Sequence, residues 1–269
     1  MARNRIPEPT GWRATDLGIC AAAAALPLLC HGAAMFINVE PGSWFTISPA
    51  IRWSLAADCM LYTAVCAIVA APIAGVAVAS ARRSDERRDR RMADVSTGVG
   101  TLAIASVLFT VVSAVFSIAW RFGQANALSL VLQSHVTVLS VTVALAAWGA
   151  LCAAWLHDPL DAAAVSVIVA LGAAGGLLVG GAAVADLPPA VLAVGLTANP
   201  LVAVASAAHI DIMRMDLLYQ ISPLAHMQFE YPTWERACAW YLAVAFACCL
   251  GVTWKSRTSF GAFALKGLP

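Results

Sequence analysis

Two histidines interrupt runs that are otherwise apolar, and imidazole is well suited to bind metals or carry protons near neutral pH. His31 stands six residues before the end of the apolar run 17–37, and His135 stands eight residues into the run 127–156. If both runs cross a membrane, the two rings lie about 10 Å below the same face. That depth permits a haem, a metal ion or a quinol, because ionisable groups inside membranes are often functional. Two unrelated histidines bonded to backbone carbonyls are the alternative.

A dense group of arginines lies between the second and third apolar runs. Residues 82–91 hold six arginines and three acidic residues. Such a mixture is typical of a helix that docks onto a protein partner, whereas a purely basic run would favour anionic lipid, at about 1 kcal/mol per arginine. Docking and a simple role in setting topology both remain open from the sequence. The candidate partner-coupling residues are Arg82, Arg83, Arg87, Arg88, Arg90 and Arg91.

The segment 186–236 concentrates the irregular backbone of the chain. Its first half is apolar but is interrupted by prolines, and its second half is charged and aromatic. Irregular backbone at membrane depth persists only where protein buries it or water reaches it. We therefore expect this segment to line a translocation path or to form a solvated outer surface, with Asp211 and Arg214 paired at helical spacing. Its candidate residues are Asn199, Pro200, Asp211, Arg214, Tyr219 and Pro223.

The composition indicates an integral membrane protein. Of the 269 residues, 61% are hydrophobic and 12% are charged, with a mean hydropathy of +0.80, whereas soluble domains carry about 25% charged residues. The chain has no Gly-x-x-x-x-Gly-Lys-Ser/Thr loop and no HExxH or GxSxG motif, so we expect neither enzymatic activity nor nucleotide binding on this chain. The eight cysteines lie in apolar runs without a CxxC pair, which favours small buried hydrophobes over a metal site.

The fold expected is all-α, a single transmembrane domain over residues 1–269 with six spans. A re-entrant or outer helical segment at 186–236 is expected between spans 5 and 6. Each predicted span is close to the roughly 20 residues that a bilayer requires. The five glycines of span 5 are expected to allow close helix packing. The predicted spans are 17–37, 57–79, 96–119, 127–156, 162–184 and 237–252.

The distribution of basic residues predicts the orientation. With six spans, 12 of the 16 lysines and arginines lie on the side that holds both termini. Cytoplasmic loops carry the excess of basic residues, so both termini are expected in the cytoplasm. A full crossing by 190–208 would move the basic C-terminal tail outside, which favours the re-entrant element.

The second half of the chain resembles the permease subunits of ABC-2 type transporters. The resemblance covers about residues 96–255 and rests on VTVALAAWGALCAAWLHDPLDAAAVSVIVAL at 141–171, on the Asn199-Pro200-Leu201 step and on YQISP at 219–223. In that family a long span ends in a short polar break, and an alanine-rich span follows. An arginine-rich loop stands where many members carry a Glu-rich stretch containing Gly-Thr.

This resemblance implies a permease, typically of an exporter, in the bacterial inner membrane. It implies a cytoplasmic ATPase subunit as partner, a second permease copy or related chain, and contact with the lipid bilayer but not with nucleic acid. The chain itself would hold no cofactor, because ATP would bind the partner. Two other hypotheses stay open. One is a haem- or metal-binding anchor of a redox complex that uses His31 and His135, and the other is a non-catalytic assembly subunit.

Overall fold

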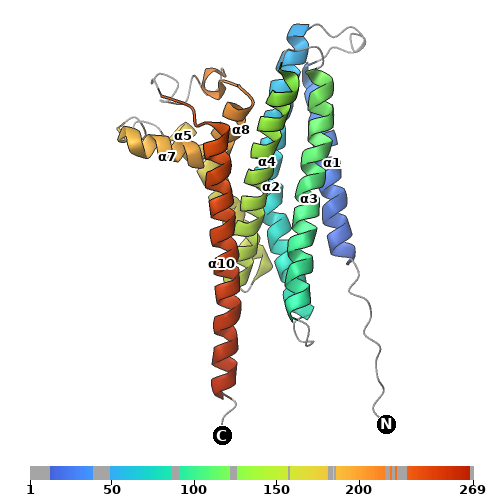
Figure 1. The fold of residues 1–269 in the computed structure, drawn as a ribbon, viewed down its shortest axis with the longest axis vertical. Coiled ribbons are helices and arrows are strands. Elements are labelled where there is room, and N and C mark those ends of the chain that lie inside the picture. The colour runs from blue at the N-terminus through green and yellow to red at the C-terminus, as the bar shows by residue number, and fades with distance from the viewer. Residues whose placement is uncertain are drawn as a thin grey trace.

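The computed structural model describes residues 13–38, 49–85, 91–121, 126–156, 158–180, 184, 186–215, 219, 222 and 229–266. Throughout these residues the regular structure is helical (Figure 1). Six helices are long and apolar enough to cross a membrane, and a bent pair of short helices precedes the last of them. The prediction of an all-α membrane protein with six spans and a helical segment between spans 5 and 6 is therefore confirmed.

The described helices extend beyond several of the predicted spans. Charged residues continue the second and third helices into 82–91, and the last helix continues to Lys266 rather than ending at 252. Span 5 is shorter than predicted, because its helix ends at Val179 instead of residue 184. The elements are α1 (Ala14–Asn38), α2 (Pro49–Asp85), α3 (Arg91–Trp120), α4 (Ala127–Trp155), α5 (Pro159–Val179), α7 (Pro189–Ala198), α8 (Pro200–Ala207), η1 (Ile212–Arg214) and α10 (Trp234–Lys266).

The long helices run alternately up and down, and α4 lies at the centre of the bundle (Figure 1). Its buried side chains, such as Val138 and Val141, share one core with Met60 of α2 and Tyr241 of α10. The first residues of α1 and the last of α10 lie at the same end, called here the lower end. The upper end is where α1 and α3 finish and where α4 and α10 begin.

Helices α2 and α4 touch through glycines. A Cβ atom added to Gly149 would overlap the carbonyl oxygen of Pro72, and one added to Gly75 would overlap the carbonyl oxygen of Ala146. The contact is reciprocal, since each helix presents a glycine to the backbone of the other. Small residues of this kind let membrane helices approach closely.

The glycines of α5 behave differently from those of α2 and α4. A Cβ atom added to Gly172, Gly175 or Gly176 would meet nothing within 4 Å. We call these three residues the α5 glycine face. The prediction that they pack closely against another helix is therefore wrong within the described chain. The buried side of α5 is instead made by Ala162, Ser166, Ala170 and Ala174.

Helix α3 is polar on its inner face and apolar on its outer face. Ser106, Thr110, Ser113 and Ser117 are all buried and recur at spacings of three or four residues. On the opposite side, large apolar residues such as Val111 and Val115 are exposed. The hydroxyls of Ser106 and Thr110 donate to carbonyls one turn earlier in α3. The faces of α3 are thus arranged for a membrane, with polar groups satisfied inside the bundle.

The bent pair α7 and α8 turns the chain back to the upper end. The two helices meet at an angle of 80°, and α7 lies across the direction of the long helices (Figure 1). Proline starts each of them, because proline at the first helical position has the required φ and needs no N–H partner. The break predicted at Asn199-Pro200 is present.

Candidate functional site

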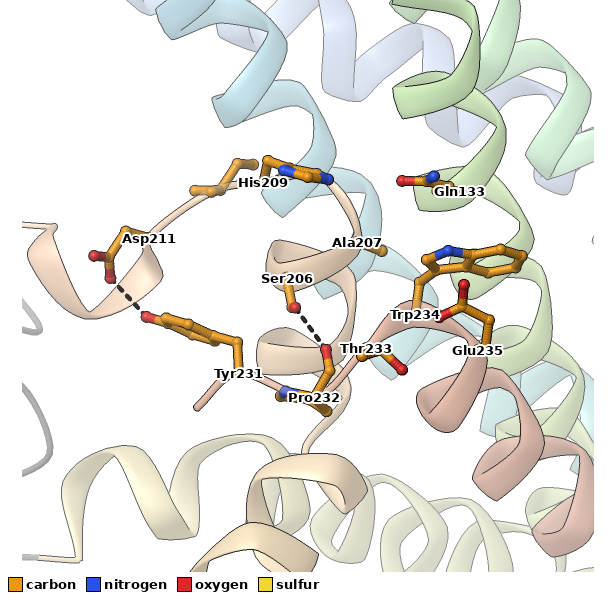
Figure 2. Close-up of a pocket in the computed structure, with 11 residues that line it drawn as sticks. Gln133, Ser206, Ala207, His209, Asp211, Tyr231, Pro232, Thr233, Trp234 and Glu235 are labelled. Atoms are coloured by element: carbon orange, nitrogen blue, oxygen red, sulfur yellow. Dashed lines mark hydrogen bonds between the residues drawn. The ribbon is translucent and has the colours of Figure 1, made fainter. Parts of the chain in front are cut away.

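A pocket of about 590 Å³ opens at the upper end, where α8 finishes and α10 begins (Figure 2). Its walls come from α4, from the end of α8 and the turn after it, and from residues 231–235, where the chain enters α10. We call it the upper pocket. It is lined by Gln133, Ser206, Ala207, His209, Ile210, Asp211, Tyr231, Pro232, Thr233, Trp234 and Glu235.

Asn199 fixes the start of the short helix that carries one wall of the pocket. Its Oδ1 accepts hydrogen bonds from the backbone N–H groups of Leu201 and Val202, each at 3.0 Å. Its Nδ2 donates to the carbonyl oxygen of Ala174 in α5, at 2.8 Å. The residue is 1% exposed. One buried side chain therefore caps α8 and ties it to α5.

Tyr241 satisfies the other side of the same break. Its hydroxyl donates to the carbonyl oxygen of Ala198 at 2.7 Å, and that carbonyl is the last of α7. Carbonyls at a helix end have no partner within the helix and are costly to bury alone. Tyr241 lies on α10, so the break between α7 and α8 is joined to both α5 and α10.

The turn after α8 shapes the pocket. His209 adopts a left-handed conformation, with φ at 57°, and the N–H of Ile210 donates back to the carbonyl of Ala205 at 2.8 Å. This pattern closes a helix end and reverses the chain. The Ser206 hydroxyl then donates to the carbonyl of Pro232 at 2.7 Å, which holds the approach to α10 against α8.

Each side of the pocket lining combines an aromatic ring with polar side chains. The Tyr231 hydroxyl donates to Oδ1 of Asp211 at 2.6 Å, and Figure 2 shows this pair opposite Trp234, Glu235 and Gln133. The pocket can hydrogen-bond and stack on a small solute, as ligand sites commonly do. Among the described residues, no group of three or more His, Cys, Asp or Glu side chains could hold a metal ion.

Several sequence-predicted residues lie elsewhere than in this pocket. Asp211 lines the pocket, whereas Asn199 lies at the opposite end of α8 and the exposed Tyr219 is not a lining residue. The predicted Asp211–Arg214 pair cannot be followed, because the Arg214 side chain and Pro223 lie outside the described residues. Sequence reasoning missed Gln133, His209 and Trp234, each of which is ordinary in its own segment.

Of the arginine group, Arg82 is the member whose side chain is described. It faces Asp16 across the lower end of α1 and α2, with Nη2 and Oδ2 3.5 Å apart and with 11% and 5% of the side chains exposed. Nearby, Arg13 donates to the carbonyl of Ala81 at 3.1 Å. The Arg82–Asp16 ion pair therefore links the lower ends of α1 and α2. Arg87, Arg88 and Arg90, and the side chains of Arg83 and Arg91, lie outside the described residues.

His31 and His135 both lie against the upper half of α3. The His31 ring stacks on Phe116, with centroids 4.9 Å apart, and its Nδ1 accepts from the indole N–H of Trp120 at 3.2 Å. The Nε2 of His135 lies 3.1 Å from the Ser113 hydroxyl. The two imidazoles are within electrostatic range of each other. Their common neighbour is the face of α3 between residues 113 and 120.

Hydrogen bonds already occupy both nitrogens of His135. Its Nδ1 lies 2.7 Å from the carbonyl of Val131, which can only accept, so Nδ1 carries the proton. Its Nε2 then accepts from the hydroxyl of Ser113 or Ser117. Axial ligation of a haem or metal by His135 would have to break these bonds. The geometry therefore favours a hydrogen-bonded role for this residue.

No protein-family model, curated protein or solved structure matches this chain.

Proposed function

We propose that the chain is the membrane-spanning permease subunit of an ATP-driven transporter, with the upper pocket as its solute site. The observation that carries the proposal is the break at Asn199-Pro200, which is bonded to α5 through Ala174 and to α10 through Tyr241. The pocket lies between the end of α8 and the start of α10. A movement of either helix would therefore change the shape of the pocket.

In this proposal, the pocket opens and closes as α10 shifts relative to α4 and α8. Trp234 and Glu235 sit on the first turn of α10, whereas Gln133 belongs to α4. A small displacement between these helices alters the distance across the pocket without unfolding either one. Packed helices sliding in this way are a common form of conformational change.

The energy would come from a nucleotide-binding subunit at the lower end. Helix α2 ends and α3 begins at that end, and the mixed charge of the sequence 82–91 between them suits a protein partner. The resemblance to ABC-2 permeases favours such a partner and a second copy of the chain. The α5 glycine face is open within the described chain and offers a surface for that copy.

The test is ATP hydrolysis that depends on this chain. Tagged protein is purified in mild detergent from its own host, and vanadate-sensitive ATP hydrolysis is measured in the eluate. The double reversal Arg87→Glu with Arg88→Glu is expected to remove most of the activity, because it repels the partner. The matched control is Arg214→Glu with Arg236→Glu, which reverses two arginines near the upper end and should keep the activity.

The pocket is tested separately. Trp234→Ala should reduce ATP-driven solute export from cells while leaving co-purified ATP hydrolysis in place. If no ATPase accompanies the wild-type protein, or if both double reversals behave alike, the permease proposal fails.

A further inference from the structure

We propose that Cys30 of α1 and Cys66 of α2 form a redox modification site, at which a hydroperoxide oxidises the two thiols to a disulfide that fastens α1 to α2. The site is made by these two helices, neither of which contributes a described residue to the upper pocket. The inference does not depend on the transport proposal.

The sulfur atoms of the two cysteines are already in contact. Both thiols are free, their Sγ atoms lie 3.2 Å apart, and either can donate to the other. The residues are 36 positions apart in the sequence, so the contact is made by the packing of α1 on α2 and not by a local turn. A disulfide joins sulfurs about 2.05 Å apart, so the two atoms have to approach by only about 1 Å.

Packing on both helices holds the two thiols at the same level. Cys30 is fixed through the next residue, His31, whose Nδ1 accepts from the indole N–H of Trp120 in α3 at 3.2 Å. Cys66 packs against the central core that α2 shares with α4 and α10. Side chains in packed interiors keep defined positions. The two sulfurs therefore face each other without the help of a loop or a hinge.

The two thiols differ in how easily an oxidant reaches them. Cys30 is 5% exposed, whereas Cys66 is half-buried. Both belong to helices that can span a membrane, where charged molecules are costly to bring. Hydroperoxides suit this environment, because hydrogen peroxide is small and uncharged and the hydroperoxides of unsaturated lipids reside in the bilayer itself. Cys66 is the thiol that such an oxidant meets first.

The reaction consumes one hydroperoxide for each pair of thiols. The sulfur of Cys66 attacks the terminal oxygen of the O–O bond, and the other oxygen leaves with the thiol proton as an alcohol, or as water when the oxidant is hydrogen peroxide. The sulfenic acid formed in this way condenses readily with a nearby thiol. Cys30 attacks its sulfur, the S–S bond forms, and the hydroxyl leaves with the Cys30 proton as water. The two thiols lose two electrons, and the hydroperoxide gains them.

The disulfide would add a covalent link where α1 meets the rest of the bundle. Helix α1 packs on α2 and α3, and its lower end is linked to α2 by the Arg82–Asp16 ion pair. Cys30 lies in the upper half of α1, so the new link would hold the helix at a second level. A cross-link also restricts the unfolded chain. The oxidised protein should therefore unfold at a higher temperature than the reduced protein.

The experiment uses the full-length protein, reduced with dithiothreitol and then freed of it. One portion in a maltoside detergent receives hydrogen peroxide, and another is placed in phosphatidylcholine vesicles that carry phospholipid hydroperoxide. The remaining thiols are blocked with N-ethylmaleimide, and a tryptic digest is analysed by mass spectrometry without reduction. Trypsin cleaves after Arg52, which separates Cys30 from Cys66. We expect a peptide pair joined through these two cysteines, its loss when dithiothreitol is added back, and a higher Tm of the linked protein in detergent.

Matched variants identify the two sulfurs. The same tryptic peptides also contain Cys20 and Cys59, so Cys20→Ala with Cys59→Ala should keep both the link and the rise in Tm. Cys30→Ser or Cys66→Ser should abolish both. A link that forms with hydrogen peroxide alone identifies a soluble oxidant, and a link that forms in the vesicles identifies the bilayer as a source.

Three outcomes would overturn the proposal, and the first two need only the wild-type protein. One is that no link forms at hydroperoxide concentrations that oxidise the exposed Cys249. Another is that the linked and reduced proteins have the same Tm, because α1 would then not be fastened. The third is that a link between the two peptides persists in Cys30→Ser or Cys66→Ser, which would assign it to other cysteines.

Discussion

Two sets of glycines in this bundle have opposite surroundings. Gly75 and Gly149 each face the backbone of a neighbouring helix so closely that no side chain fits. Gly172 and Gly176 face open space. All four lie in apolar helices and look alike in the sequence. A glycine in a membrane helix therefore does not by itself indicate close packing. The element that faces it must also be known.

The two sides of α5 extend this comparison. Its alanine-rich side is covered and is bonded to α8 through Asn199, whereas its glycine face has no covering element in the described chain. A helix that packs on one side within its own chain and leaves a small-residue face open on the other is suited to pack against a helix of a second chain.

Gly149→Val should be the most damaging substitution. Its side chain would collide with the backbone carbonyl of Pro72, and backbone cannot move aside as a flexible side chain can. We expect a loss of about 3 kcal/mol in the free energy of unfolding, at the upper end of the usual cost of overpacking. Thermal unfolding in detergent measures it. Gly176→Val is the control, and equal losses in both variants would remove the distinction between the two sets of glycines.

Asn199→Ala should destabilise by about 2 kcal/mol. The substitution removes the cap of α8, which is worth about 1 kcal/mol, and leaves the carbonyl of Ala174 without its donor. Asn199→Ser keeps a capping oxygen but is too short to reach α5, so it should recover about half of the loss. If Asn199→Ala unfolds at the wild-type temperature, the covered side of α5 does not depend on this bond.

Tyr241→Phe isolates the bond to α10. It deletes one hydroxyl that donates to Ala198 and keeps the buried ring. A net hydrogen bond contributes about 1 kcal/mol, so the unfolding temperature should fall by a few degrees. Tyr219→Phe changes an exposed tyrosine and serves as the control. A fall no greater than that of the control would mean that water replaces the lost donor at Ala198.

Gly172→Leu with Gly176→Leu should leave the stability of the single chain almost unchanged, within about 0.5 kcal/mol. Both positions have room for a side chain. If a second copy packs on the α5 glycine face, the same variant should shift the protein to a smaller assembly. Light scattering coupled to size exclusion measures this, with Ala173→Leu as the control. A wild-type protein that is already a single chain would leave the face to lipid.

The features that were predictable from the sequence are local ones. Long apolar runs predicted the six spans, and the prolines at 188–189 and 200 predicted the break in the segment between spans 5 and 6. Helices α2, α3 and α10 continue beyond the predicted spans, because hydropathy marks only the part of a helix that lies in the membrane core. Arginine, lysine and alanine continue a helix beyond that core at little cost.

The sites depend on contacts that no local pattern specifies. Nothing in the sequence joins Gln133 to Trp234 or Trp120 to His31, since these pairs come from different helices. Helix rise predicted a similar depth for His31 and His135, and both rings do lie against the upper half of α3. The hydrogen-bond partners of their ring nitrogens could not be predicted. The glycines of α5 were assigned a partner helix on composition alone, and the described chain offers none.

Helix α10 has a mechanical consequence that follows from its length. Its 33 residues span about 50 Å, whereas a bilayer core is about 30 Å thick. Lys255 lies over the ring of Trp155, 4.8 Å from the centroid, and we propose this contact as the pivot for a tilt of α10. About 30 Å of rod extends from it to Trp234 in the upper pocket, and about 16 Å extends to Lys266. A tilt of about 10° would move the pocket end by about 5 Å and the opposite end by about 3 Å. In the permease proposed above, α10 would therefore convert a short movement at its lower end into a longer one at the upper pocket.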